Sequence, residues 1–157
     1  MSPKHYKIIL TTKMNQVILA QTDTTVGFLS QNASRLSNIK ARPPHKPFIQ
    51  SFDSFRSFKT MGGRMPQTFK KRLRRAQHTT FVINNRAIRI VTEGPHHTLL
   101  QKYGWLYSTS ANEKSQSFEL DFAVKHSDFI VEDERGLFEG TASDIYKINS
   151  KKIRQLR

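Results

Sequence analysis

The sequence predicts a mixed-sheet α/β fold in a single domain that covers residues 1–157. The length is sufficient for one hydrophobic core, and 36% hydrophobic and 24% charged residues are typical of a globular chain. Short apolar segments of strand character are mixed with helical segments, and the two types do not alternate strictly. Because strict alternation is typical of parallel βαβ sheets, this irregular order favours a mixed sheet.

Eight segments are predicted to be strands because they are short and rich in branched or aromatic side chains. Asn15-Gln16 offers a possible turn between the first two, and Asn84-Asn85 offers a hairpin turn between the fourth and fifth. In chain order the predicted strands are 6–10, 17–21, 48–52, 79–83, 87–91, 105–107, 129–131 and 145–148.

The first two helical segments are predicted from their caps. Asn32 can cap a short helix, which must end near Arg42 because Pro43-Pro44 follow. Asp53 is expected to cap one or two helical turns over 55–58.

The later helical segments are predicted from proline, glycine and apolar spacing. Pro66 suits the first turn of a helix that continues over 67–77. A further helix over 97–103 ends at Gly104. Residues 118–124 are ambiguous between helix and strand.

The net charge of +14 is unevenly distributed along the chain. Residues 1–78 hold 15 Lys and Arg against two acids, which gives +13, whereas residues 79–157 hold 11 against 10. Such an excess in one half predicts a polyanionic partner such as RNA. The RNA-binding candidates are Lys70, Lys71, Arg72, Arg74 and Arg75, although a solvated helix face explains the same run.

Several classes of site are not expected from the composition. The chain has no cysteine, and its six histidines lack the spacing of metal ligands, so no protein metal site is expected. No Ser-His-Asp set is identified. No apolar run reaches the ~20 residues of a membrane span, and the N-terminus lacks the apolar core of a signal peptide, so a cytoplasmic protein without membrane contact is expected.

Three polar stretches carry the candidate chemistry. They read Gln-Thr-Asp-Thr-Thr-Val-Gly over 21–27, Lys-Ala-Arg-Pro-Pro-His-Lys over 40–46 and Ser-Thr-Ser-Ala-Asn over 108–112. Hydroxyls at strand ends can hold phosphate or carboxylate, and cations in a loop stiffened by proline can pair with phosphate oxygens. Each stretch alone is weak evidence, since threonine also suits strands and turns.

In this order, the three stretches resemble the YrdC-like family of threonylcarbamoyl-AMP synthases. The family pattern has Pro-Thr-Glu-Thr-x-x-Gly, then Lys-x-Arg-Pro-x-x-(Asn/Lys)-Pro-Leu-Ile, and later Ser-x-Ser-Ala-Asn. The resemblance covers roughly residues 16–156 and implies a twisted open sheet with flanking helices and a basic concave face. It also implies synthesis of threonylcarbamoyl-adenylate from threonine, bicarbonate and ATP, for the threonylcarbamoylation of adenosine 37 in tRNA.

The resemblance assigns roles to residues of this chain. Thr22 and Thr24 correspond to positions near threonine, and Arg89 to an arginine with a structural or substrate-orienting role. Mg²⁺ is expected to arrive with ATP rather than as a permanent cofactor. The implied ATP contacts are Lys40, Arg42, Lys46, Thr80, Ser108, Ser110, Asn112, Ser143 and Arg154.

The chain departs from the family pattern mainly at the threonine positions. A histidine that contacts threonine in the family corresponds to Ser51, and a Lys or Arg for the threonine carboxylate corresponds to Asn84. Two further interpretations therefore remain open. One is a non-catalytic module that binds double-stranded RNA or tRNA, and the other is an interaction protein that acts only with other tRNA-modification proteins.

Overall fold

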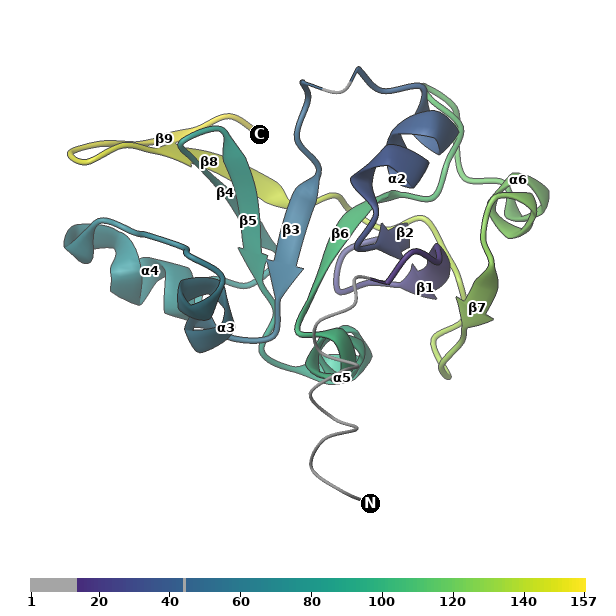
Figure 1. The fold of residues 1–157 in the computed structure, drawn as a ribbon, viewed down its shortest axis with the longest axis horizontal. Coiled ribbons are helices and arrows are strands. Elements are labelled where there is room, and N and C mark those ends of the chain that lie inside the picture. The colour runs from purple at the N-terminus through teal and green to yellow at the C-terminus, as the bar shows by residue number, and fades with distance from the viewer. Residues whose placement is uncertain (1–13, 44) are drawn as a thin grey trace.

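The computed structural model describes residues 14–43 and 45–157, and the strand predicted at 6–10 lies outside them. Within the described residues, nine strands form one sheet in the order β7-β1-β2-β6-β3-β5-β4-β8-β9 (Figure 1). The pairs β1–β7, β3–β5 and β4–β8 are parallel, and the other five pairs are antiparallel. The predicted mixed α/β sheet is confirmed.

The elements are short, as the sequence predicts. The strands are β1 (Ile18–Gln21), β2 (Val26–Ser30), β3 (Ile49–Phe52), β4 (Thr79–Ile83), β5 (Arg86–Ile90), β6 (Trp105–Ser110), β7 (Phe129–Val131), β8 (Asp144–Ile148) and β9 (Ile153–Gln155). The helices are α2 (Ala33–Lys40), α3 (Phe55–Thr60), the 3₁₀ turn η1 (Gln67–Phe69), α4 (Lys70–Arg75), α5 (Gly94–Tyr103) and α6 (Leu120–Lys125).

Several predicted turns and caps are confirmed. Asn32 caps α2 by accepting a hydrogen bond from the Arg35 backbone nitrogen. The helix ends at Ala41, which has a left-handed backbone. Asn84 and Asn85 both have positive φ, as a two-residue hairpin turn requires.

Other boundaries differ from the predictions. Ser54, not Asp53, caps α3, because its hydroxyl reaches the Ser57 backbone nitrogen. The helix predicted over 67–77 is divided into η1 and α4 and ends at Arg75, where the backbone of Ala76 becomes extended. Most of the ambiguous segment 118–124 is helical, because α6 begins at Leu120 and ends at Lys125.

The sheet is also more extensive than predicted. Strands β2 and β9 were not predicted, and β6 continues to Ser110, three residues beyond the expected end. Polar residues continue β6 because Ser108 pairs with both Leu29 and Ile49 on neighbouring strands. Two-sided pairing therefore overrides the weak strand propensity of serine.

The strand registers define two faces of the sheet. We call the front face the one that holds Ile49, Ser51, Thr80, Arg89 and Ser108, and the back face the one that holds Phe52, Phe81 and Ile88. Helix α5 covers part of the front face through Leu100, which packs with Leu29 and Leu106.

The other helices cover the back face. Phe58 of α3, Phe69 of η1 and Leu73 of α4 pack there with Phe52 and Phe81. Leu36 of α2 and Ala123 of α6 pack at the other end of the sheet. None of the helices in the described ranges has the length and apolar character of a membrane span.

Candidate functional site

A cavity of about 150 Å³ opens on the front face of the sheet. Segments distant in the sequence form its wall: the β1–β2 loop, the chain after α2, the strands β3, β5 and β6, the approach to β8, and the C-terminal residue. It is lined by Thr22, Thr24, Thr25, Gly27, Arg42, Ile49, Arg89, Ser108, Thr109, Ser110, Ala142, Ser143 and Arg157. We call it the front cavity.

Three arginines and no acidic side chain line the front cavity in the described part of the chain. Arg42 donates to the Pro47 carbonyl oxygen at 3.1 Å, and its guanidinium lies 4.6 Å from the centre of the Phe48 ring. Arg157 donates from Nε and Nη2 to the Ser143 carbonyl oxygen at 3.0 and 2.9 Å. These contacts hold two cationic groups at the cavity, a charge balance that favours an anionic ligand.

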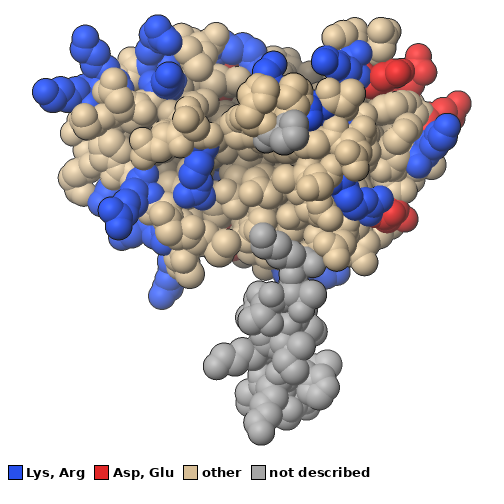
Figure 2. Space-filling view, turned by 45° about the horizontal axis from the view of Figure 1, so that its top comes forward, with Lys and Arg blue, Asp and Glu red and all other residues tan. Residues whose placement is uncertain are grey.

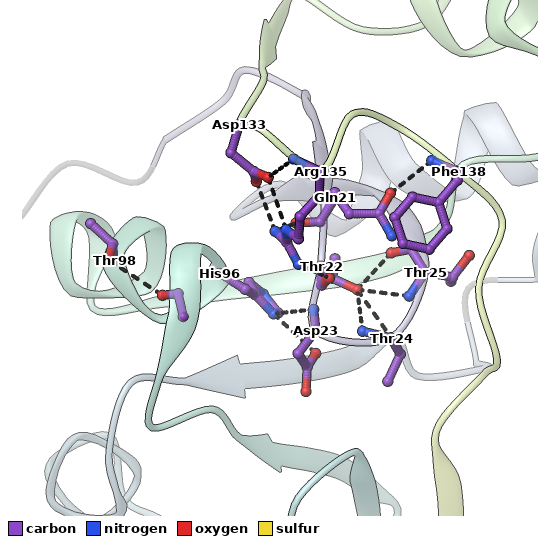
Figure 3. A network of polar contacts seen from close by, with 11 residues as sticks. Gln21, Thr22, Asp23, Thr24, Thr25, His96, Thr98, Asp133, Arg135 and Phe138 are labelled. Carbon is purple, nitrogen blue, oxygen red and sulfur yellow. Dashed lines mark hydrogen bonds and ion pairs between the residues drawn. The ribbon is translucent and has the colours of Figure 1, made fainter.

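The third arginine belongs to a buried polar cluster beneath the cavity. Arg89, 3% exposed, forms an ion pair with Asp23. His96 Nδ1 lies 3.1 Å from the same carboxylate (Figure 3). Burial, and then the charge of Arg157, lowers the pKa of Arg89 to about 10, so it remains cationic at neutral pH. Burial and the nearby charge of Arg89 lower the pKa of His96 to about 3, which keeps the imidazole neutral.

Some buried atoms of this region have no hydrogen-bond partner among the described residues. They are Ser51 Oγ, Arg89 Nε and Nη2, and His96 Nε2, although Arg89 Nη2 is the atom that pairs with Asp23. Unpartnered buried polar atoms are costly, so a site that retains them is suited to a polar ligand or water.

The β1–β2 loop is held by a hydrogen-bond network (Figure 3). The Thr22 hydroxyl donates to the Thr25 carbonyl oxygen at 2.6 Å and accepts from the Thr24 and Thr25 backbone nitrogens at 3.2 Å. Arg135 donates to the Thr22 and Gln21 carbonyl oxygens and is itself held by Asp133. The Thr22 hydroxyl is therefore engaged within the loop, whereas Thr24 is half-buried and its hydroxyl contacts only that of Thr22 at 3.3 Å in the described residues.

Lys40 connects two of the predicted motifs. Its ammonium donates to the carbonyl oxygens of Ser110 and Asn112 at 3.0 and 2.6 Å, and to Asn112 Oδ1 at 3.0 Å. Burial, and then the charge of Arg42, lowers the pKa of Lys40 to about 8. Because three acceptors engage its ammonium, Lys40 fixes the end of β6 beside α2 rather than lining the cavity.

The structure brings together six of the predicted site residues at the front cavity and places five elsewhere. Thr22, Thr24, Arg42, Ser108, Ser110 and Ser143 line it. The remaining five predicted residues do not: Lys40, Lys46, Thr80, Asn112 and Arg154.

These five residues have other surroundings. Thr80 is fully buried, and its hydroxyl bonds with that of Ser143 at 2.8 Å, behind the cavity wall. Asn112 is bonded to Lys40, and Lys46 lines a different cavity on the back face. Arg154 is exposed on β9, opposite Lys147 in the strand register.

Arg157 is a cavity residue that no sequence motif indicated. It lies nine residues beyond the end of β8, at the C-terminus. Residues 153–157 read Ile-Arg-Gln-Leu-Arg and do not alternate, so the sequence carries no clear signal for the strand that returns the chain to the sheet. Thr25 and Thr109 also line the cavity and belong to motifs already singled out.

The basic helix α4 lies on the opposite side of the sheet from the front cavity. Its Leu73 packs into the back-face core, while Arg72 lies over the Tyr146 ring and Arg74 over the Phe55 ring. Figure 2 shows Lys and Arg spread over the end of the molecule that holds α4 and the β8–β9 hairpin, while the acids gather at the end near α6 and β7. The candidate RNA-binding residues therefore lie at the basic end but not on the front face.

The comparisons with known proteins agree with this architecture. Residues 11–157 match the model of the Sua5/YciO/YrdC family, whose description reads "Telomere recombination". A search of curated protein sequences finds no match.

Solved structures resemble the chain in fold at low sequence identity. Sua5 from P. abyssi, solved with L-threonine, has a TM-score of 0.73 at 16% identity over 90% of this chain and 50% of its own. This chain thus spans about half the length of that Sua5. YciO from E. coli has a TM-score of 0.68 at 16% identity over 98% and 86% of the two chains. MTH1692 from Methanobacterium thermoautotrophicum has 0.61 at 18% identity over 98% and 84%.

Proposed function

The chain belongs to the Sua5/YciO/YrdC family, and from this premise we propose that it is a threonylcarbamoyl-AMP synthase-like domain. It would form threonylcarbamoyl-adenylate from threonine, bicarbonate and ATP, for the modification of adenosine 37 in tRNA. The observation that carries the proposal is the convergence of Arg42, Arg89 and Arg157 with several hydroxyls in one cavity that no acidic side chain lines. Such a site suits a reaction between anions, in which the protein mainly positions the reactants and neutralises charge.

In the proposed reaction, the threonine amine and bicarbonate form a carbamate with loss of water. A carbamate oxygen then attacks the α-phosphorus of ATP. The bond between the α-phosphorus and the oxygen that bridges it to the β-phosphate breaks, and pyrophosphate leaves. Arg42 and Arg157 would neutralise the phosphates, and Ser108, Ser110 and Ser143 would hydrogen-bond the nucleotide. No covalent intermediate with the protein is needed.

Magnesium would enter with the nucleotide. Among residues 14–43 and 45–157, no three His, Asp or Glu side chains are grouped as metal ligands. The arginine-lined cavity fits a triphosphate rather than a bare cation, so Mg²⁺ would be coordinated by ATP oxygens and water.

Threonine would lie near the β1–β2 loop. P. abyssi Sua5 was solved with L-threonine, and the half-buried Thr24 of this chain lines the front cavity. Asn84 lies in the β4–β5 hairpin turn and does not line the front cavity. We assign the contact with the threonine carboxylate to Arg89, which lines the base of the cavity and pairs with Ser51 in the strand register.

The first prediction concerns the nucleotide. Arg42→Ala removes a cavity-lining cation, so it should weaken ATP binding by about 1.5–3 kcal/mol, the range for a charge-assisted hydrogen bond. Isothermal titration of the folded variant measures the loss. Arg64→Ala, at an exposed position, is the charge-matched control, and unchanged affinity in Arg42→Ala contradicts the assignment.

Catalysis is tested separately by pyrophosphate release. We expect release from ATP only when threonine and bicarbonate are both present, and no release when either is omitted. Release that appears only after tRNA-modification proteins are added would favour the interaction-protein interpretation.

Binding of tRNA or double-stranded RNA is the second candidate function. The Lys and Arg side chains spread over the end of the molecule that holds α4 and the β8–β9 hairpin favour it (Figure 2). The second prediction is that affinity falls steeply with salt, because each phosphate contact releases a counterion. Replacing Lys71 and Arg75 by glutamine should reduce the log–log salt slope by about one unit for each phosphate contact that the substitutions remove. Salt-independent binding, or no tRNA binding at low salt, contradicts the candidate.

A further inference from the structure

A second cavity, of about 230 Å³, lies on the back face of the sheet. It opens between α2 and the strands β3, β5 and β6, and we call it the back cavity. Figure 1 shows α2 and the α3–α4 pair over separate parts of the sheet, with β3 between them. It is lined by Ala33, Ser37, Lys46, Pro47, Phe48, Gln50, Arg86, Ala87 and Tyr107.

The charged side chains that line the back cavity favour an anionic ligand. Arg86 and Lys46 are its two charged lining residues, and none of the described residues that line it is acidic. Arg86 donates from Nη2 to Gln50 Oε1 at 3.1 Å, which fixes the guanidinium against β3 and leaves its other N–H groups without a hydrogen-bond partner in the described residues. Two cations match a phosphate monoester better than a carboxylate, since the monoester carries about −1.5 to −2 charges at neutral pH.

The remaining wall suits a flat ring. Phe48 is buried and Tyr107 half-buried, and both ring systems line the cavity. Gln50 lines the cavity and is 8% exposed as a whole residue. Its amide oxygen accepts from Arg86, whereas its amide nitrogen makes no hydrogen bond in the described parts of the chain and is not among their fully buried unpartnered atoms. An accessible amide donor at the cavity would bind a ring carbonyl or ring nitrogen.

From these observations we propose that the back cavity is a second ligand site, which binds a phosphate monoester carrying one flat heterocycle. Arg86 and Lys46 bind the phosphate, Phe48 and Tyr107 flank the ring, and Gln50 donates to it.

This site is separate from the front cavity, because the two lining sets share no residue. Ile49 lines the front cavity, whereas the next residue, Gln50, lines the back cavity, as the alternation of a strand requires. Lys46, which the family resemblance implies as an ATP contact, lines the back cavity and not the front one.

The test is a titration of the full ¹⁵N-labelled chain with uridine 5′-monophosphate, followed by NMR. The Ser37 and Ala87 amides report the back cavity, and those of Thr109 and Ala142 report the front cavity. We expect saturable shifts at Ser37 and Ala87, at least about tenfold weaker binding of uridine or of inorganic phosphate alone, and unchanged binding in Arg157→Ala, which removes a cation of the front cavity only.

Two variants test the assigned contacts. Arg86→Gln should weaken binding by about tenfold or more, whereas Arg56→Gln, an exposed arginine of α3, should leave it unchanged. Gln50→Glu retains an acceptor for Arg86 but adds a negative charge, so it should also weaken binding while the chain stays folded. Absence of shifts at Ser37 and Ala87, shifts confined to Thr109 and Ala142, or equal affinity in Arg86→Gln would overturn the proposal. If the front cavity does not bind ATP, the proposal for the back cavity is unaffected.

Discussion

The two faces of the sheet differ in the polarity of the side chains that they bury. The back face buries Phe52, Phe58 and Phe81 in a continuous aromatic core beneath α3 and α4. The front side of the sheet buries Arg89 and His96 beside the half-buried Asp23, with polar atoms that lack partners in the described residues. Because apolar burial stabilises a fold whereas buried charge costs free energy unless it is fully paired, the back face contributes more to stability. The front face keeps the groups that can interact with a ligand.

The largest expected effect tests whether the back face contributes more to the free energy of unfolding than the front face. Phe58→Ala should lower the free energy of unfolding by about 3–5 kcal/mol, because it leaves a cavity among packed rings. Ser108→Ala on the front face is the control and should cost less than about 1.5 kcal/mol, since the serine makes no side-chain hydrogen bond in the described residues. Urea denaturation measures both. A similar loss in the two variants would show that the faces contribute equally.

A smaller effect concerns the buried imidazole of the front face. The folded pKa of His96, about 3, lies below its ordinary value of 6.5, so the unfolded chain binds a proton in this window that the folded chain does not. The contribution of the neutral His96 imidazole to the free energy of unfolding is therefore fully present above pH 6.5, and it is lost as the pH falls toward 3. Between pH 6.5 and 5 the loss should reach about 2 kcal/mol.

The variant His96→Leu isolates that contribution from those of the acids. Denaturation at pH 6.5 and pH 5 should show a loss about 2 kcal/mol smaller in the variant than in the unmodified chain. The same loss in both would mean that His96 is protonated in the folded state and belongs to a charged, not a neutral, cluster.

The smallest expected effect tests whether Thr80 supports the cavity wall or contacts ATP directly. Thr80→Val removes the hydrogen bond to Ser143 and should lower the free energy of unfolding by about 1 kcal/mol. ATP affinity should remain nearly unchanged, because Thr80 is fully buried behind the cavity. A loss of affinity as large as that expected for Arg42→Ala would restore Thr80 to the contacts implied by the family resemblance.

The sequence by itself determined the class of fold, most of the strands and the motifs that mark the front cavity. Short apolar segments and the Asn84-Asn85 turn are local signals, which can be recognised without knowledge of distant segments. Arg42, Ser108 and Ser110 were found because each belongs to a short motif, and the structure places all three around one cavity.

Only the tertiary structure decided which polar groups meet. Lys40 and Arg42 are two residues apart in the sequence. Lys40 donates to the chain at the end of β6, whereas Arg42 lines the front cavity. Arg157 reaches the same cavity from the C-terminus, and Lys46 faces the other side of the sheet. The physical reason is that strand pairing and register assign each side chain to a face, and these depend on segments that are distant in the sequence.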